Sequence, residues 1–79
     1  MKILAIDYGL KRVGIAVSFA DLAQPLLILE NNPTLLQRLG ELIATHQVKK
    51  IVVGVSEGEM AKLSLEFAQK LRNKFSLPE

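Results

Sequence analysis

One carboxylate and two cations near the start of the chain carry the clearest chemical signal. Asp7 follows an apolar run at residues 3–6, and Lys11 and Arg12 come directly after a turn that contains Gly9. A carboxylate at the end of a buried strand is a ligand for hard cations such as Mg²⁺ or Mn²⁺. Arginine forms paired hydrogen bonds to phosphate oxygens. This turn is therefore a place where a metal ion and a phosphate would meet.

Each of these residues also has an ordinary structural interpretation. Asp7 would start a turn and accept hydrogen bonds from backbone N–H groups. Lys11 and Arg12 would be solvated cations at a hairpin tip, and Tyr8 would either stack on a base or pack against a neighbouring loop. A two-metal phosphodiesterase site needs several carboxylates around ions about 4 Å apart, and Asp7 supplies one. From the residues alone both interpretations stay open.

Other polar residues give weaker signals. Glu57 and Glu59 follow a predicted strand and are candidates for auxiliary metal ligands, or else they are acids favoured at a helix N-terminus. His46 lies near the end of a predicted helix, where capping is its ordinary role. Ser18 and Ser56 have no neighbouring base in the sequence, which argues against nucleophilic catalysis.

Composition narrows the function classes further. The 79 residues include no cysteine and one histidine, which excludes disulfides, thiolate catalysis and cysteine-based zinc sites. The net charge of +2 permits nucleic-acid binding without predicting it. No apolar run approaches the roughly 18 residues that span a bilayer. We expect one small domain in the cytoplasm, with no membrane partner.

Hydrophobic periodicity predicts four strands and two helices. Residues 19–24 are expected to form a loop, and Gly40 is expected to pack closely on the sheet. The unbroken β-branched run at 51–55 is typical of a strand covered on both faces. The predicted strands are residues 3–6, 12–18, 25–29 and 51–55, and the predicted helices are residues 34–46, capped by Asn32 or Thr34, and a segment from Glu59 whose apolar positions include Leu65 and Phe67.

The order β-β-β-α-β-α predicts an α/β fold with a mixed sheet in the order 3-2-1-4. Three strands with short links form a meander, and a right-handed crossover carries the fourth strand to the far side of the first. Asp7 and the loops at 8–12 and 56–59 would then share one edge, outside the carboxyl ends of the parallel strands. Strand 51–55 would be an unpaired edge, so we expect either a fragment or a homo-oligomer formed through it.

The first motif resembles the opening motif of the YqgF/RuvX family. These ribonuclease-H-fold proteins are described as Holliday junction resolvases or pre-16S rRNA nucleases. The resemblance implies that Asp7 is a catalytic acid that binds Mg²⁺ or Mn²⁺, and that Tyr8, Gly9, Lys11 and Arg12 contact DNA junctions or structured RNA. It covers essentially the whole chain and rests on Asp7-Tyr8-Gly9-x-Lys11-Arg12-x-Gly14-x-Ala16-x-Ser18, Ala23-Gln24-Pro25-Leu26, Lys50-Ile51-Val52-Val53-Gly54 and Glu66-Phe67-Ala68.

Two departures from the family pattern shape the functional prediction. The loop after Gly54 is shortened, and the family's further catalytic acids, from a fifth strand and a C-terminal helix, would lie beyond Glu79. We therefore expect residues 1–79 to be a single truncated ribonuclease-H-like domain. It would be a metal-dependent, structure-selective nuclease domain, incomplete in this chain and weak in metal binding. The alternatives are an inactive nucleic-acid-binding or self-assembling module and, third, an actin-like phosphate-binding ATPase fragment.

Overall fold

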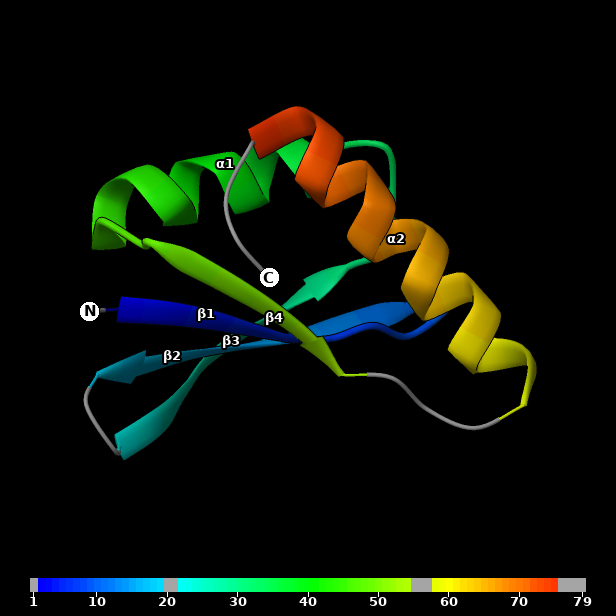
Figure 1. The fold of residues 1–79 in the computed structure, drawn as a ribbon, viewed down its shortest axis with the longest axis horizontal. Helices are drawn as coiled ribbons and strands as arrows, with labels where there is room; N and C mark the ends of the chain where they lie inside the picture. The colour runs from blue at the N-terminus through cyan, green and yellow to red at the C-terminus, as the bar shows by residue number, and fades with distance from the viewer. Residues whose placement is uncertain (1, 20–21, 55–57, 76–79) are drawn as a thin grey trace.

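Four strands and two helices follow one another in the predicted order. The computed structural model describes residues 2–19, 22–54 and 58–75. The elements are β1 (Lys2–Asp7), β2 (Arg12–Phe19), β3 (Leu22–Glu30), α1 (Leu35–His46), β4 (Lys50–Gly54) and α2 (Glu59–Phe75), as Figure 1 shows.

The strands form one mixed sheet in the order β3-β2-β1-β4, which confirms the predicted 3-2-1-4 order. β1 and β2 pair antiparallel, from Lys2 opposite Phe19 to Asp7 opposite Gly14. β2 and β3 are also antiparallel, as a meander requires. The crossover through α1 returns β4 parallel to β1, with Asp7 beside Gly54. Asp7 therefore ends the central pair of strands.

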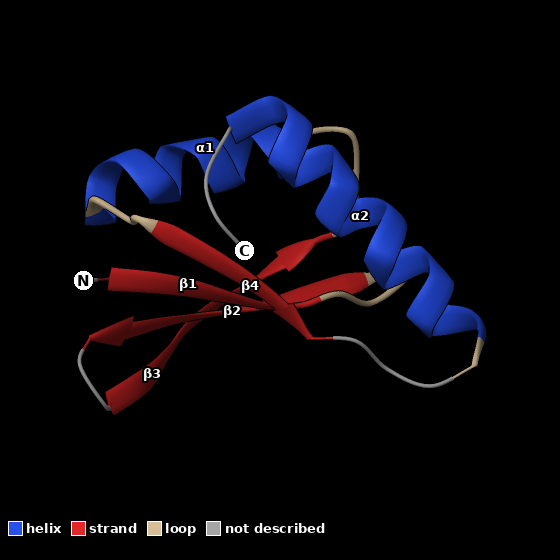
Figure 2. Cartoon of the chain, viewed as in Figure 1, coloured by secondary structure: helices blue, strands red, loops and turns tan. Residues whose placement is uncertain are grey.

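Both helices lie on the same side of the sheet (Figure 2). Strand side chains alternate between faces, so Leu4 and Ile6 of β1 point toward the helices while Ala5 and Asp7 point away. The core therefore lies between the sheet and the helices. It consists of Leu4, Ile6, Val13, Ile15, Leu35, Leu39, Val48, Ile51, Phe67 and Leu71.

The opposite face of the sheet, which we call the open face, carries apolar side chains that no described helix covers. Val52 is 42% exposed and Ile28 is 70% exposed. The expectation that strand 51–55 is covered on both faces is therefore wrong at Val52, because both helices occupy one face. Residue 55 lies outside the described residues. β4 is nevertheless an edge strand among the described strands, as predicted.

Three local expectations also need correction. Residues 22–24 belong to β3 and Phe19 to β2, so the predicted 19–24 loop is mostly strand. Strand pairing continues there because β2 offers a partner for each of these residues. Gly40 packs against α2 instead of the sheet, since an added Cβ would lie 3.2 Å from the Phe75 ring. Leu65, expected among the apolar positions of α2, is 58% exposed.

The start of α1 uses the asparagine that the sequence suggested, although in a different way. Thr34 is the N-cap residue and makes no side-chain capping bond. The Asn32 side chain instead accepts hydrogen bonds from the Thr34 backbone N–H at 2.9 Å and from its hydroxyl at 2.6 Å. The helix ends at His46, and Gln47 follows in a left-handed conformation. No α-helix in the described part of the chain has the length and apolarity needed to cross a membrane.

Candidate functional site

Asp7 is exposed at the carboxyl end of β1, on the open face of the sheet. Its two strand partners are glycines, Gly14 on β2 and Gly54 on β4. Neither partner has a side chain to shield the carboxylate. Among the described residues, none donates a hydrogen bond to this carboxylate, so the backbone N–H contacts expected of a turn-forming aspartate are not seen there. The carboxylate is left accessible to a ligand.

The Asp7 side chain lies at the rim of an apolar hollow in the open face. The hollow has a volume of about 450 Å³ and is lined by strand residues that include Ala5, Ala16, Ile28 and Val52. The carboxylate itself is exposed to solvent, so a ligand can reach it from the hollow.

The turn between β1 and β2 is tightly closed at Gly9. A Cβ atom at this position would lie 2.5 Å from the Arg12 carbonyl oxygen, a distance that real Cβ atoms do not tolerate. Glycine is needed here because the backbone of residue 12 passes so close. The tight turn places Lys11 and Arg12 near the end of β1 that carries Asp7.

Asn31 braces this turn from the end of β3. Its side-chain Nδ2 donates to the Gly9 carbonyl oxygen at 2.8 Å, across 22 residues of sequence. Its backbone N–H donates to the Lys11 carbonyl oxygen at 2.9 Å. Each such bond contributes about 1 kcal/mol. The pair holds the turn in one shape without using the side chains of Lys11 or Arg12.

Tyr8 lies on the other face of the sheet from Asp7. Its ring stacks on the Phe67 ring of α2, with centroids 4.3 Å apart and an interplanar angle of 24°. The structure therefore assigns Tyr8 a packing partner, which is a helix and not the neighbouring loop that the sequence suggested. Because the ring is half-buried, it keeps some accessible surface beside Asn32 and Lys70 in a shallow pocket.

Lys11 and Arg12 are both exposed. Arg12 is the first residue of β2 and stands opposite Glu30 in the strand pairing. Both side chains are free to reach outward from the braced turn. Together they offer two positive charges at the end of β1 that carries Asp7, with the Glu30 carboxylate opposite Arg12. Such cations suit a phosphodiester that approaches from the end of β1.

The other candidate residues do not join Asp7 in a cluster. Glu59 is exposed at the first residue of α2, which agrees with the helix N-terminal alternative. Glu57 lies outside the described residues, as does Ser56. His46 is the last residue of α1. The described residues contain no group of three or more His, Cys, Asp or Glu side chains that would hold a metal ion.

Sequence reasoning missed Asn31 and Phe67 as parts of this site. The sequence pattern gives Asn31 no role and indicates Phe67 only as an apolar position of a helix. A contact that spans 22 residues leaves no periodic signal in the sequence. The one available signal was an asparagine at a strand end, a residue type that often bonds to nearby backbone.

Comparison with known proteins identifies the family of this chain. The family described as "RuvX: Holliday junction resolvase" matches residues 1–79. A protein of Sulfurihydrogenibium sp. (strain YO3AOP1), named "Putative pre-16S rRNA nuclease", is 38% identical over 80 residues, covering 91% of this chain and 55% of that protein. A protein of the same name from Nitrosomonas eutropha is 34% identical over 86 residues, covering 96% of this chain and 55% of the relative.

A third relative with that name, from Paraburkholderia xenovorans, is 36% identical over 86 residues and is covered over 59% of its length. The chain thus spans somewhat more than half the length of these curated relatives. The family match extends over every residue of the chain, including the Asp7 motif and both glycines that flank Asp7 in the sheet. The chain belongs to the RuvX family.

Proposed function

We propose that this chain is a nuclease domain that acts on the phosphodiesters of branched DNA or of precursor ribosomal RNA, and that its sheet is the ribonuclease-H-like core. The observation that carries the proposal is the exposed Asp7 carboxylate between two glycines, next to a turn that presents Lys11 and Arg12. The names of the family and of the relatives support the same chemical class. A nuclease of this class would act in the cytoplasm, where these nucleic acids are found.

Asp7 suits a divalent metal ion as one ligand, but the described residues do not supply a complete set of ligands. The accessible carboxylate oxygen is the ligand type that Mg²⁺ and Mn²⁺ prefer. A two-metal site needs further carboxylates, and no group of three metal-binding side chains occurs in residues 2–19, 22–54 and 58–75. We therefore propose that Asp7 contributes one metal ligand, with Glu57 as a further candidate, and that metal binding by this chain is weak.

The residues of the turn have separate roles in this proposal. Arg12 and Lys11 would bind the non-bridging oxygens of a phosphate, Arg12 through its planar fork. Gly9 would let the substrate backbone approach, since it has no side chain. Tyr8 would contact the substrate through the exposed part of its ring. A bound metal ion would supply activation of water and stabilisation of the leaving oxygen.

One observation favours a second candidate, a nucleic-acid-binding module without cleavage. The described residues hold no group of three or more metal-binding side chains, and cleavage through two metal ions needs several carboxylates. This candidate uses the same braced turn and the same cations. It differs from the first only in the outcome of a cleavage assay.

The two candidates are separated by incubating the chain with a four-way DNA junction and with a structured ribosomal RNA precursor, with Mn²⁺ or with EDTA. A nuclease cleaves in Mn²⁺ and loses cleavage in Asp7→Asn. The matched control is Glu41→Gln, which removes an exposed carboxylate from α1. Cleavage that survives in Asp7→Asn would reject Asp7 as the catalytic acid, and binding without any cleavage would select the second candidate.

A further inference from the structure

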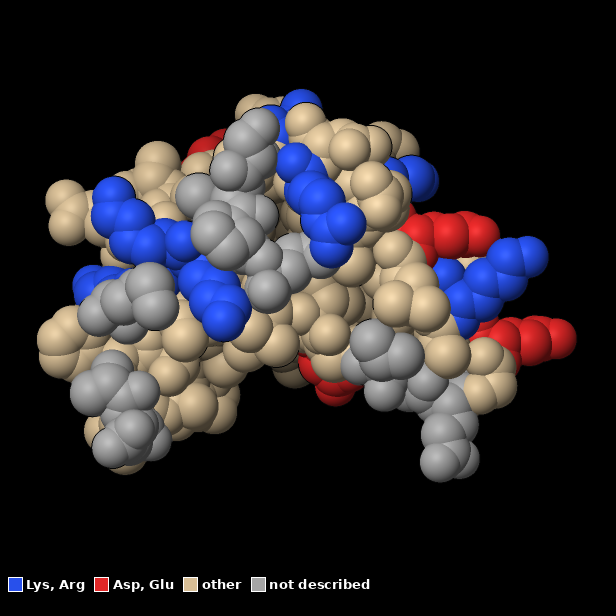
Figure 3. Space-filling model, in the orientation of Figure 1, with Lys and Arg blue, Asp and Glu red and all other residues tan. Residues whose placement is uncertain are grey.

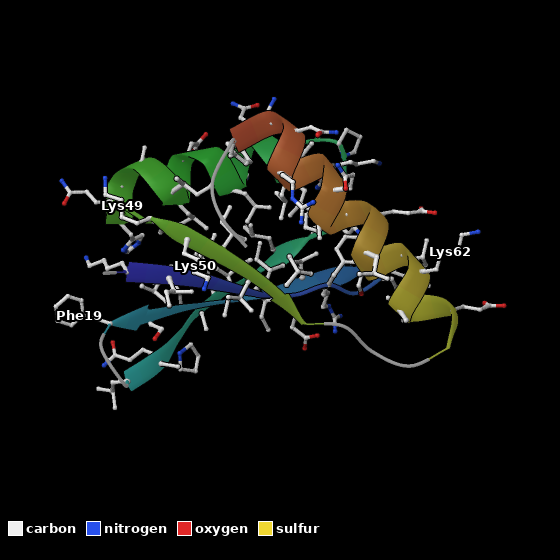
Figure 4. All side chains as sticks on the ribbon, in the orientation of Figure 1. Phe19, Lys49, Lys50 and Lys62 are labelled. Carbon is white, nitrogen blue, oxygen red and sulfur yellow. The ribbon has the colours of Figure 1, made fainter. Side chains whose placement is uncertain are left out.

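Three lysines gather at the end of the sheet opposite Asp7. The Lys49 backbone N–H donates to the Lys2 carbonyl oxygen at 3.0 Å, and Lys50 pairs with Ile3 in the parallel ladder of β1 and β4. Lys2 and Lys49 are far apart in the sequence, so the fold creates this cluster. In Figure 3, Lys and Arg side chains lie at the left end of the molecule, where Figure 4 labels Lys49 and Lys50, and others lie at the centre and at the right end.

No acidic side chain in the described part of the chain forms an ion pair with these lysines. Lys49 is exposed, Lys2 and Lys50 are half-buried, and none of the three forms an ion pair with a described residue. In the same view, Asp and Glu side chains are most prominent at the right end of the molecule (Figure 3). Unpaired like charges that sit side by side raise the local positive potential and attract polyanions.

An exposed aromatic ring lies next to the lysines. Phe19 is 61% exposed at the end of β2 and stands directly opposite Lys2 in the strand pairing. Figure 4 shows its side chain extending away from the sheet at the same end as Lys49 and Lys50, while Lys62 lies at the other end on α2. The Phe19 side chain is not part of the buried core.

A hollow joins the ring to hydrogen-bonding side chains. Its volume is about 350 Å³, and Phe19, Lys2, Gln24 and His46 are among the residues that line it. This volume lies at the lower end of the range of about 300–1,000 Å³ for sites that bind small molecules or parts of larger ones. An aromatic wall with an amide, an imidazole and an ammonium group suits a nucleobase, which offers a flat face and polar edges.

We propose that this end of the sheet is a second nucleic-acid contact, specific for a single-stranded segment. Lys2, Lys49 and Lys50 bind the phosphates, and one base stacks on Phe19 at the mouth of the hollow. The inference rests on the proposed function only in taking nucleic acid as the partner. We refer to these four residues as the lysine–phenylalanine surface.

The lysine–phenylalanine surface lies at the other end of β1 from Asp7. Five steps from Lys2 to Asp7, at about 3.3 Å per residue, separate them by about 16 Å along the strand. By strand alternation Lys2 and Phe19 point to the helix-covered face, whereas Lys50 points, like Asp7, to the open face. The surface therefore wraps around the end of the sheet and is a contact separate from the one at Asp7.

Binding of a fluorescein-labelled 12-nucleotide oligouridylate, measured by fluorescence anisotropy in EDTA between 25 and 200 mM NaCl, tests the proposal. These are roughly the conditions in which phosphate contacts dominate the salt dependence. Lys49→Gln/Lys50→Gln should reduce the slope of log K against log salt by about 1.4, at about 0.7 for each lost contact to a single strand. Phe19→Leu should weaken binding about five-fold or more and leave the slope unchanged, because stacking carries no charge.

The matched control is Arg38→Gln/Lys62→Gln, which removes two exposed cations from the helices and should leave the salt slope close to that of the unmodified chain. Circular dichroism of each variant checks that the fold is retained. Equal loss of slope in the two double variants, or full binding by Phe19→Leu, would overturn the proposal. Competition by polyglutamate as strong as by unlabelled oligouridylate would also overturn it, in favour of an acidic protein partner.

The proposed function fails or stands independently of this result. Glu41→Gln should bind the oligouridylate in EDTA as the unmodified chain does, because Glu41 is an exposed carboxylate of α1 that belongs to neither contact. Absence of cleavage with intact, Phe19-dependent binding would reject the nuclease and support the second contact. If the chain cleaves and its binding does not depend on Phe19, Lys49 or Lys50, the nuclease is supported and the second contact is rejected.

Discussion

Substitution of Gly9 by alanine should disrupt the turn that presents Lys11 and Arg12. The added Cβ would lie 2.5 Å from the Arg12 carbonyl oxygen, whereas comfortable contacts between carbon and oxygen begin at about 3.3 Å. One of the two backbone segments must move by about 0.8 Å to restore that contact distance. Such a movement strains both hydrogen bonds that Asn31 makes to the turn, at Gly9 and at Lys11.

The expected cost follows from these contacts. Overpacking costs about 1–3 kcal/mol, and each weakened hydrogen bond adds up to about 1 kcal/mol. We expect Gly9→Ala to lower the free energy of unfolding by about 2–3 kcal/mol, which lowers Tm by roughly 10–20 °C in a domain of this size. Urea unfolding followed by circular dichroism measures the first quantity and thermal unfolding the second.

Two other glycines provide matched controls. An added Cβ at Gly14 would lie 3.6 Å from the Asp7 Cβ, and one at Gly54 would lie 3.7 Å from the Ile6 carbonyl oxygen, both ordinary contacts. Gly14→Ala and Gly54→Ala should therefore change the free energy of unfolding by no more than about 1 kcal/mol. If Gly9→Ala proves as stable as these controls, the close approach at the turn does not constrain residue 9 and the reasoning is wrong.

Three further predictions concern single side chains. Asn31→Ala should cost about 1 kcal/mol of stability and weaken oligonucleotide binding, since the cations lose their fixed support; unchanged binding by anisotropy would contradict this. Ser64→Ala should raise Tm by several degrees, because the buried Ser64 hydroxyl has no hydrogen-bond partner among the residues that the structure describes; a lower Tm would contradict it. If β4 mediates self-association, light scattering will show a mass that rises with concentration and falls to that of a monomer in Val52→Lys; a monomer throughout would reject the association.

The sheet was largely predictable because its signals are local and strong. The run at 3–6, the turn around Gly9 and the β-branched run from Ile51 each determine their own structure, and the right-handed crossover then fixes the strand order. Asp7 was correctly placed beside the end of the fourth strand, opposite Gly54. Periodicity and chirality are sufficient for that placement.

The burial of individual side chains was less predictable, because it depends on which face of the sheet the helices pack against. Val52 and its neighbours have the composition of a strand covered on both faces, yet both helices pack on one face and leave Val52 exposed. Leu65 is likewise as hydrophobic as a core residue, but it lies on the exposed side of α2. The sequence pattern records which residues are apolar, whereas the partner that covers them depends on the whole arrangement.

The candidate site was likewise predictable only in part. Strand alternation puts neighbouring residues on opposite faces, so Asp7 is accessible while Tyr8 stacks on Phe67. The family resemblance assigns both residues to one site, and that assignment stays a prediction. The role of Asn31 could not be predicted from the sequence, because its bond to Gly9 forms only when the folded chain brings together two residues that are 22 positions apart.

The hollow of the open face also affects how unfolding of this chain should be monitored. A dye such as anilinonaphthalene sulfonate, whose fluorescence rises in apolar surroundings, would bind the native sheet beside Ala16, Ile28 and Val52. Dye fluorescence, the usual sign of a molten globule, would here accompany full tertiary order and decrease as the sheet unfolds. The near-ultraviolet signal of Tyr8, the single tyrosine, reports the packed state directly through its stacking on Phe67.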